Sequence, residues 1–334
     1  MEFVNNTFIY FFAFIIVLTI IVFVHEFGHY FAAIINKVKV ETFSIGFGKE
    51  IFGFNDKNGT RWKFCLIPLG GYVKFFGDRN VFSQAEQAEI LKKYSKQDQQ
   101  RLFITKPLYQ RALIVAAGPF ANFILAIVIF SLIYMFVGKD FTPAKIDEVA
   151  VESPAEKSGL KKNDIIVSID NNKVESILEV STYINTAFSD QINIKVLRNQ
   201  KEITVITEPT IVEAKDAFGN SIKKKIIGIK IAPINNQINK KKLGPTKAIY
   251  YSIKETWFVS KTTIKFIGSL FKGKGDVSQL GGPIKIVKIS GQVLEFGIVA
   301  FFSVIAYISI SLGLINLFPI PLLDGGHLMF FLFE

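Results

Sequence analysis

Two histidines and a glutamate stand close together near the start of the chain, in the segment His25-Glu26-Phe27-Gly28-His29. Residues four apart lie on one face of a helix, so both imidazoles can reach the same metal ion. The neighbouring carboxylate can then take a proton from water at that ion. These residue types at this spacing predict a zinc site for hydrolysis. The alternative is a pair of buried histidines that are merely hydrogen-bonded.

A catalytic zinc ion usually has three protein ligands, so another ligand should come from elsewhere in the chain. The best source is the segment from Asn316 to His327, in which Asp324 is an isolated carboxylate. His327 is the other candidate ligand. We favour Asp324, because His327 could equally orient a ligand without touching the metal. Asn316 could donate a hydrogen bond to a substrate carbonyl, or it could cap a broken helix.

Three apolar stretches are long enough for membrane spans, which need about 20 residues each. They run from Phe8 to Ile35, from Ala112 to Val137 and from Gly297 to Leu317. A fourth apolar stretch, Leu328 to Phe333, resembles a truncated span, so we expect about four transmembrane helices. A cleaved signal peptide is the competing interpretation of the first stretch, but no basic segment precedes it and its apolar run is too long.

The predicted metal ligands fall inside or beside these apolar stretches. Ionisable groups in hydrocarbon are costly and need partners within the protein. Pro319 and Pro321 should break the helix before Asp324, and broken helix is tolerated in a membrane where it lines a cavity. A metal-ion transporter would share these features. Glu26 favours a hydrolase, because a transporter needs ligands but no base.

The chain is basic, with a net charge of +11 over 334 residues. The lysines are spread along the chain without interleaved aromatic residues, so we expect no nucleic-acid partner. Lys37, Lys39, Lys106 and Arg111 flank the first two apolar stretches, which favours a cytoplasmic loop between them. The single cysteine, Cys65, cannot form an internal disulfide.

Patterns of polarity divide the chain into six expected parts. The loop between the first two spans has β composition with a polar surface helix at 83–100, and the segment after the second span alternates like a small α+β domain. The amphipathic segment 246–272 could lie in the membrane interface or pack on a soluble domain. The expected parts are a first transmembrane helix at 1–36, a β-rich loop at 37–107, a second transmembrane helix at 108–138, the α+β domain at 139–235, the amphipathic and connecting region at 236–296, and a third transmembrane helix with the start of a fourth at 297–334.

The sequence resembles the bacterial site-two proteases, close to the regulator-of-sigma-E proteases. Besides the two segments above, the resemblance rests on Gly46-Phe47-Gly48, on the stretch from Pro68 to Lys74 and on Gly118-Pro119-Phe120-Ala121-Asn122. It implies an intramembrane zinc metalloprotease. One Zn²⁺ would be held by His25, His29 and Asp324, with Glu26 as the base. An inactive scaffold is disfavoured, because every catalytic position is filled.

The resemblance also implies a setting. The protein would be a multi-pass protein of the bacterial inner membrane, with 139–235 as a periplasmic PDZ-like domain that binds a peptide or a substrate ectodomain. Substrates would be single-span membrane proteins, such as anti-sigma factors already trimmed by an upstream site-one protease, or remnant signal peptides. Only one PDZ-like unit is recognisable, whereas the best-known members have two in tandem.

Such an enzyme must unwind its substrate, because a transmembrane helix hides its carbonyls from water. Unwinding frees backbone groups that cost roughly several kcal/mol each when unpaired in an apolar setting. The segment from Trp62 to Leu69 has strand composition, and we expect it to pair with the unwound substrate as an edge strand, with Phe64 and Leu66 in the strand. Gly70 and Gly71 would let another backbone approach. The alternative is an ordinary hairpin packed on the membrane face.

Overall fold

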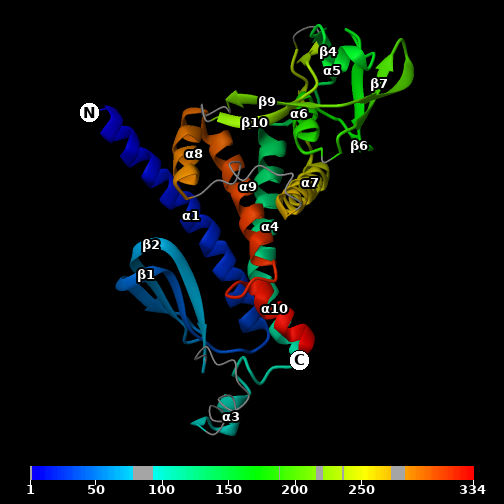
Figure 1. Cartoon of the computed structure of the whole chain (residues 1–334). Helices are drawn as coiled ribbons and strands as arrows, with labels where there is room; N and C mark the ends of the chain where they lie inside the picture. The colour runs from blue at the N-terminus through cyan, green and yellow to red at the C-terminus, as the bar shows by residue number, and fades with distance from the viewer. Residues whose placement is uncertain (1, 78–92, 188, 216–220, 235–236, 272–282) are drawn as a thin grey trace. The chain divides into compact units, whose positions relative to one another are not determined.

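The computed structural model describes residues 2–77, 93–187, 189–215, 221–234, 237–271 and 283–334. The chain divides into two compact units. One comprises Met1–Phe130 and Pro283–Glu334, and the other comprises Ser131–Gly282. Figure 1 shows the elements of both units.

Within the described residues, three helices are long and apolar enough to cross a membrane, and they correspond to the three predicted stretches. They are α1 (Glu2–Ile35), α4 (Leu108–Phe136) and α9 (Ile298–Asn316). The helix α10 (Asp324–Phe333) has 10 residues and is shorter than a span requires. The expected fourth span therefore stays a prediction.

Small residues let the three long helices approach closely in the first unit. A Cβ on Gly28 of α1 would overlap the Ala117 carbonyl of α4, and a Cβ on Gly313 of α9 would lie 2.9 Å from the Pro119 carbonyl of α4. Close backbone approach through small residues is how helices gain contact area in lipid, where both faces are already apolar. This packing brings the motif of α1 against α4.

A further helix, α8 (Pro283–Glu295), lies along the N-terminal half of α1 (Figure 1). The Tyr10 hydroxyl donates a hydrogen bond of 2.9 Å to Glu295, and a Cβ on Gly291 would overlap the Tyr10 ring. This contact holds the end of α1 that is remote from the histidines.

The loop after α1 is a folded-back β-ribbon made of β1 (Val40–Asn55) and β2 (Arg61–Phe75). Residues 42–45 of β1 have Cα partners in both 61–64 and 71–74, and residues 50–55 pair with 61–65. The order across the ribbon is therefore 50–55, 61–65, 42–45 and 71–75. Positive φ angles at Gly46 and Gly48 permit the reversal within β1.

This order places the expected substrate strand differently from the sequence-based interpretation. Phe64 has Cα partners on both sides, Ile45 and Phe52, so it lies in the interior of the ribbon. Leu66 is exposed beyond the doubly paired part. Gly70 and Gly71 lead into the segment 71–75, whose Cα partners among the described residues all lie in β1. Within the described residues, 71–75 is thus an edge of the ribbon.

The ribbon is fixed to α1 through Asp56 in its turn. Asp56 accepts hydrogen bonds from the Tyr30 hydroxyl of α1, from the Thr60 N–H at 2.9 Å and from the Trp62 indole at 3.1 Å. Burial alone would raise the pKa of Asp56, but these hydrogen bonds outweigh it and lower the pKa. Of the surface helix expected at 83–100, α3 (Lys96–Gln99) is present, and 83–92 lies outside the described residues.

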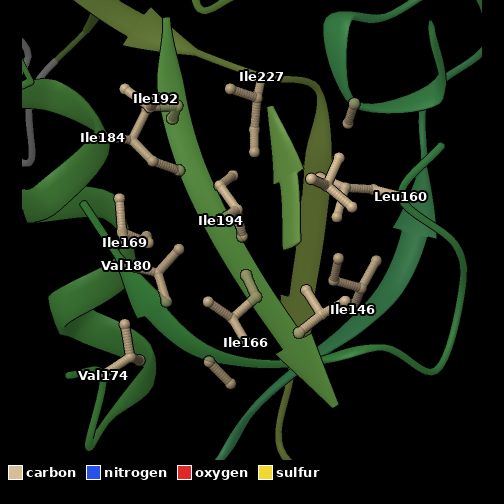
Figure 2. Packing of buried hydrophobic residues seen from close by; sticks show 14 of the residues in the cluster. Ile146, Leu160, Ile166, Ile169, Val174, Val180, Ile184, Ile192, Ile194 and Ile227 are labelled. Carbon is tan, nitrogen blue, oxygen red and sulfur yellow. The ribbon is translucent and has the colours of Figure 1, made fainter. Parts of the chain in front are cut away.

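The second unit contains a small α+β domain around an antiparallel sheet, with the strand order β11-β4-β5-β7-β8 and β6 beside β5. Its core is formed by aliphatic side chains such as Ile146, Ile166 and Ile194, which are at most 2% exposed (Figure 2). Two pairs of strands lie outside this sheet. The bounds of the elements are β3 Lys139–Asp140, β4 Ala144–Val149, α5 Pro154–Lys157, β5 Ile165–Ile169, β6 Asn172–Lys173, α6 Ile177–Asn185, β7 Ile192–Arg198, β8 Lys201–Thr207, β9 Thr210–Lys215, β10 Ser221–Ile226, β11 Ile229–Ala232 and β12 Lys240–Lys241.

The amphipathic segment forms α7 (Pro245–Phe271), and its faces are inverted relative to a soluble helix. The buried face is small and polar, with Ala248, Ser252, Thr256 and Ser260 at every fourth position. The exposed side carries apolar side chains together with Lys247, Lys254 and Lys261. The large exposed residues are Ile249, Tyr250, Ile253, Trp257 and Ile264.

The start of α7 packs on the end of α4 that belongs to the same unit. The Ser131 and Ser252 hydroxyls are 3.1 Å apart, and the Leu243 N–H donates to the Tyr134 carbonyl at 3.0 Å. On the other side, Lys254 pairs with Glu175 of the domain at 2.8 Å. The helix therefore joins the end of a candidate span to the α+β domain.

Candidate metal centre

The structure brings His25, His29 and Asp324 together, although nearly 300 residues of chain separate the histidines from the aspartate. The two imidazole Nε2 atoms are 3.3 Å apart. Asp324 Oδ2 is 3.2 Å from Nε2 of His25, and Asp324 Oδ1 is 3.5 Å from Nε2 of His29. The three side chains are 10%, 12% and 18% exposed. They form a compact, largely buried set of ligand atoms.

This set fits zinc in three respects. Tetrahedral zinc with ligands at about 2.0–2.1 Å has ligand atoms about 3.3 Å apart, which agrees with the observed separations. Two imidazoles and one carboxylate are a ligand set found in catalytic zinc sites. Asp324 Oδ2 is also a buried oxygen with no hydrogen-bond partner in the described part of the chain, as expected of a metal ligand.

The loop between α9 and α10 places Asp324 at the first position of α10. A Cβ on Gly325 would overlap the Leu317 backbone, and a Cβ on Gly326 would overlap the Ile320 carbonyl. The two glycines therefore serve close packing of the loop on the helix. Neither glycine has a positive φ angle. Leu322, before the aspartate, does have a positive φ of 77°.

Each histidine is oriented by a group on α4. Nδ1 of His29 lies 2.9 Å from the Ile114 carbonyl, which can accept its proton and leave Nε2 free for the metal. The His29 ring fills the space that a Cβ on Gly118 would occupy. Nδ1 of His25 lies 3.3 Å from the amide of Asn122. The motif at 118–122 was recognised in the sequence, but its contact with the histidines appears only in the fold.

The site opens into a cavity of about 600 Å³. Glu26 lines it, and so do Asn316 and His327. The Asn316 amide is 3.3 Å from Nε2 of His25, which places it beside the metal position. His327 belongs to the cavity wall but not to the group of ligand atoms identified among the described residues.

The ribbon edge at 71–75 borders the same cavity through Tyr72 and Val73. Glu26 lies close to this edge, because a Cβ on Gly71 would lie 3.4 Å from Cγ of Glu26. Arg111 of α4 also lines the cavity. The positions of Tyr72, Val73 and Arg111 at the cavity were missed from the sequence, because nothing local relates them to the motif of α1.

Membrane-length helices that carry a His-Glu-x-x-His pair and a facing aspartate define a membrane metallopeptidase. Residues 13–334 match peptidase family M50, and the chain belongs to this family. It is a zinc metalloprotease of the site-two protease type. The family, the enzyme class and the zinc cofactor predicted from the sequence are thereby confirmed. With its three apolar helices, it is a membrane protein of a bacterial family.

Individual relatives agree with this assignment. A protein of Mesorhizobium japonicum named "Putative zinc metalloprotease" is 40% identical, and the alignment covers 95% of this chain and 87% of that protein. Metalloprotease MmpA of Caulobacter vibrioides is 35% identical, with 95% of this chain and 84% of that protein covered. Among solved structures, a PDZ domain of an SdrC-like protein from Listeria monocytogenes matches with 25% identity and a TM-score of 0.22, covering 27% of this chain and 88% of that chain.

Proposed function

We propose that this protease cleaves single-span membrane proteins within or beside the bilayer. The observation that carries the proposal is the position of the ligand set and Glu26, on or next to helices with the length and apolarity of membrane spans. A soluble substrate would not need a site at that depth. We place the enzyme in the bacterial inner membrane, with the ribbon cytoplasmic and the α+β domain periplasmic.

In the proposed reaction His25, His29 and Asp324 hold one zinc ion, which supplies Lewis acidity to water and to the scissile carbonyl. Glu26 takes a proton from the attacking water as its oxygen bonds to the carbonyl carbon. The same carboxyl group then gives the proton to the departing amine as the C–N bond breaks. Glu26 borders the cavity and is not among the ligand atoms, which suits a base.

Asn316 is proposed to donate a hydrogen bond to the carbonyl oxygen, where charge develops during attack. Its amide lies beside the metal position, 3.3 Å from Nε2 of His25. The helix-cap alternative is weaker, because the side chain contacts the site instead of the end of α9. His327 is proposed to contact the substrate from the cavity wall.

We further propose that the unwound substrate pairs with the ribbon edge at 71–75, next to Glu26. This moves the expected contact away from Phe64 and Leu66 while keeping Gly70 and Gly71 beside it. Strand addition would satisfy the backbone groups that unwinding frees. The natural substrate class is a protein with a trimmed ectodomain, such as an anti-sigma factor or a remnant signal peptide, and the PDZ-like domain would exclude longer ectodomains.

One experiment tests the central proposal. The purified protein in detergent is incubated with a model single-span substrate, with Glu26→Gln measured beside wild type, and zinc is determined in both. We expect the variant to lose at least about 10³-fold in turnover, as loss of an essential proton-transfer group does, while keeping one zinc per chain. Loss of zinc in the variant would make Glu26 a ligand.

The same experiment separates the main rival. A metal transporter would show no cleavage by wild type, and its Glu26→Gln variant would change metal passage into vesicles. Full cleavage by Glu26→Gln would overturn the assigned base.

A further inference from the structure

The amide of Asn122 is a buried group whose hydrogen bonds do not balance. Asn122 is 0% exposed, and its Nδ2 lies 3.3 Å from Nδ1 of His25. Its Oδ1 is buried and has no hydrogen-bond partner among the described residues. An unsatisfied buried amide oxygen beside a ring nitrogen calls for a physical reason, since such groups are rare in native interiors.

Metal binding at His25 fixes what Nδ1 must do. Nε2 of His25 faces Asp324 and His29, so the metal takes Nε2 and the ring proton must sit on Nδ1. Nδ1 is then a donor and needs an acceptor. The amide NH₂ of Asn122 is also a donor, so in this orientation two donors, Nδ1–H of His25 and the NH₂ of Asn122, face each other.

Turning the Asn122 amide by half a rotation removes the conflict at Nδ1 of His25. The oxygen and nitrogen of an amide have nearly the same shape, so their assignment follows from the hydrogen-bond network. After the rotation Oδ1 accepts the His25 Nδ1–H bond and is no longer unpartnered. The arrangement then parallels His29, whose Nδ1 faces the Ile114 carbonyl at 2.9 Å.

We infer that Asn122 is a positioning residue for the metal centre, which accepts the Nδ1 proton of His25 and holds Nε2 toward the zinc. The backbone of Asn122 is itself held, because the Ser309 hydroxyl of α9 donates to its carbonyl at 2.9 Å. A Cβ on Gly313 of α9 would lie 3.1 Å from Cβ of Asn122. Three helices, α1, α4 and α9, thus meet at Asn122.

The inference rests on the zinc site of the proposed function, and its test does not use cleavage. The full chain is purified in detergent as wild type, Asn122→Asp and Asn122→Leu, and zinc affinity is measured by competition with a chelator. Aspartate keeps an acceptor and loses the NH₂ donor, whereas leucine keeps the volume and loses both. Loss of such an orienting partner costs about 10–100-fold in metal affinity.

We expect Asn122→Leu to bind zinc about 10–100-fold more weakly and Asn122→Asp to stay within about threefold of wild type. Equal losses in both variants would show that the NH₂ donor matters and overturn the inference. Wild-type affinity in Asn122→Leu would also overturn it. A ¹⁵N spectrum of labelled histidine gives a second readout, in which His25 should carry its proton on Nδ1 in the zinc-bound wild type and aspartate variant.

Two controls keep the result interpretable. Ser309→Ala removes only the hydrogen bond to the Asn122 backbone, and we expect less than about threefold loss of affinity. If Asn122→Leu does not fold, Asn122→Ala replaces it, and a ratio of aspartate to alanine affinities near one overturns the inference. Wild type that binds no zinc would instead refute the proposed function.

Discussion

Asp324 and His327 are one helical turn apart in α10, and both line the cavity. Asp324 has carboxylate oxygens 3.2 Å and 3.5 Å from the Nε2 atoms of His25 and His29, and His327 does not belong to that group of ligand atoms among the described residues. We therefore expect Asp324→Ala to weaken zinc binding by at least about 100-fold, since a direct ligand is worth more than a group that orients one. Zinc per chain after dialysis against a chelator measures this. The reverse ranking, with His327→Ala losing the metal, would make His327 the ligand.

A glycine is needed at position 118 because the His29 ring occupies the space of a Cβ there. Any side chain at 118 would overlap that imidazole, and the rigid helices around it leave little room to yield. Gly118→Ala should displace His29, lower zinc affinity by about tenfold or more and reduce turnover in proportion. Gly268→Ala, in α7, is the matched control because nothing lies within 4 Å of its Cβ position. Equal zinc affinity in both variants would contradict this packing argument.

At the scale of elements, the ribbon presents its 71–75 edge to the cavity. Neighbouring N–H groups of a strand point to opposite sides, so prolines at Tyr72 and Val73 have different consequences. A proline at the position whose N–H faces β1 removes a ladder bond, and a proline at the position whose N–H faces away from β1 removes a donor to the substrate. We expect the proline at the outward-facing position to raise KM about tenfold or more, roughly the effect of one or two lost hydrogen bonds, with zinc content unchanged.

The substrate side of this prediction is independent. Helix-destabilising residues near the scissile bond should raise turnover by wild type, because less unwinding is needed. If neither proline alters KM and substrate helicity has no effect, strand addition is wrong.

The inverted faces of α7 predict that it lies in a membrane interface. Its exposed side combines apolar residues such as Trp257 with Lys247, Lys254 and Lys261, and its start packs on the end of a candidate span, where hydrocarbon gives way to headgroups. The chain has two tryptophans, Trp62 and Trp257, so a Trp62→Phe background leaves Trp257 as the reporter. In vesicles we expect brominated lipids to quench Trp257 fluorescence strongly. Quenching by aqueous acrylamide alone would instead place the helix on a soluble surface.

At the scale of the molecule, the α+β domain is inserted between two short strands, β3 and β12, which form a joint. β3 and β12 pair with each other, with Asp140 opposite Lys240, so the ends of the insertion lie together. Replacing 143–238 by a short flexible linker should leave the joint intact. We expect the shortened enzyme to cleave short-ectodomain substrates within about threefold of wild type and to accept bulkier ones, because none of the domain's described residues contributes a ligand atom. Loss of all cleavage in a folded, zinc-bound protein would give the domain another role.

The sequence by itself determined the features that depend on local spacing. The spacing of four positions from His25 to His29 places both histidines on one helix face whatever surrounds it. Apolar length fixes the three candidate spans, and alternation fixes the strands of the small domain. Asp324 could be chosen because a lone carboxylate among apolar residues needs a partner.

Only the tertiary structure decided which distant groups meet. Asn122 lies 97 residues from His25, and the Ile114 carbonyl lies 85 residues from His29. No periodicity relates such positions, because helix packing in a membrane depends on where small residues let backbones approach. The ribbon shows the same limit. Composition identified its strands, but the reversal of β1 put Phe64 inside and 71–75 at the edge. Strand order is set by long-range pairing, which a local pattern does not encode.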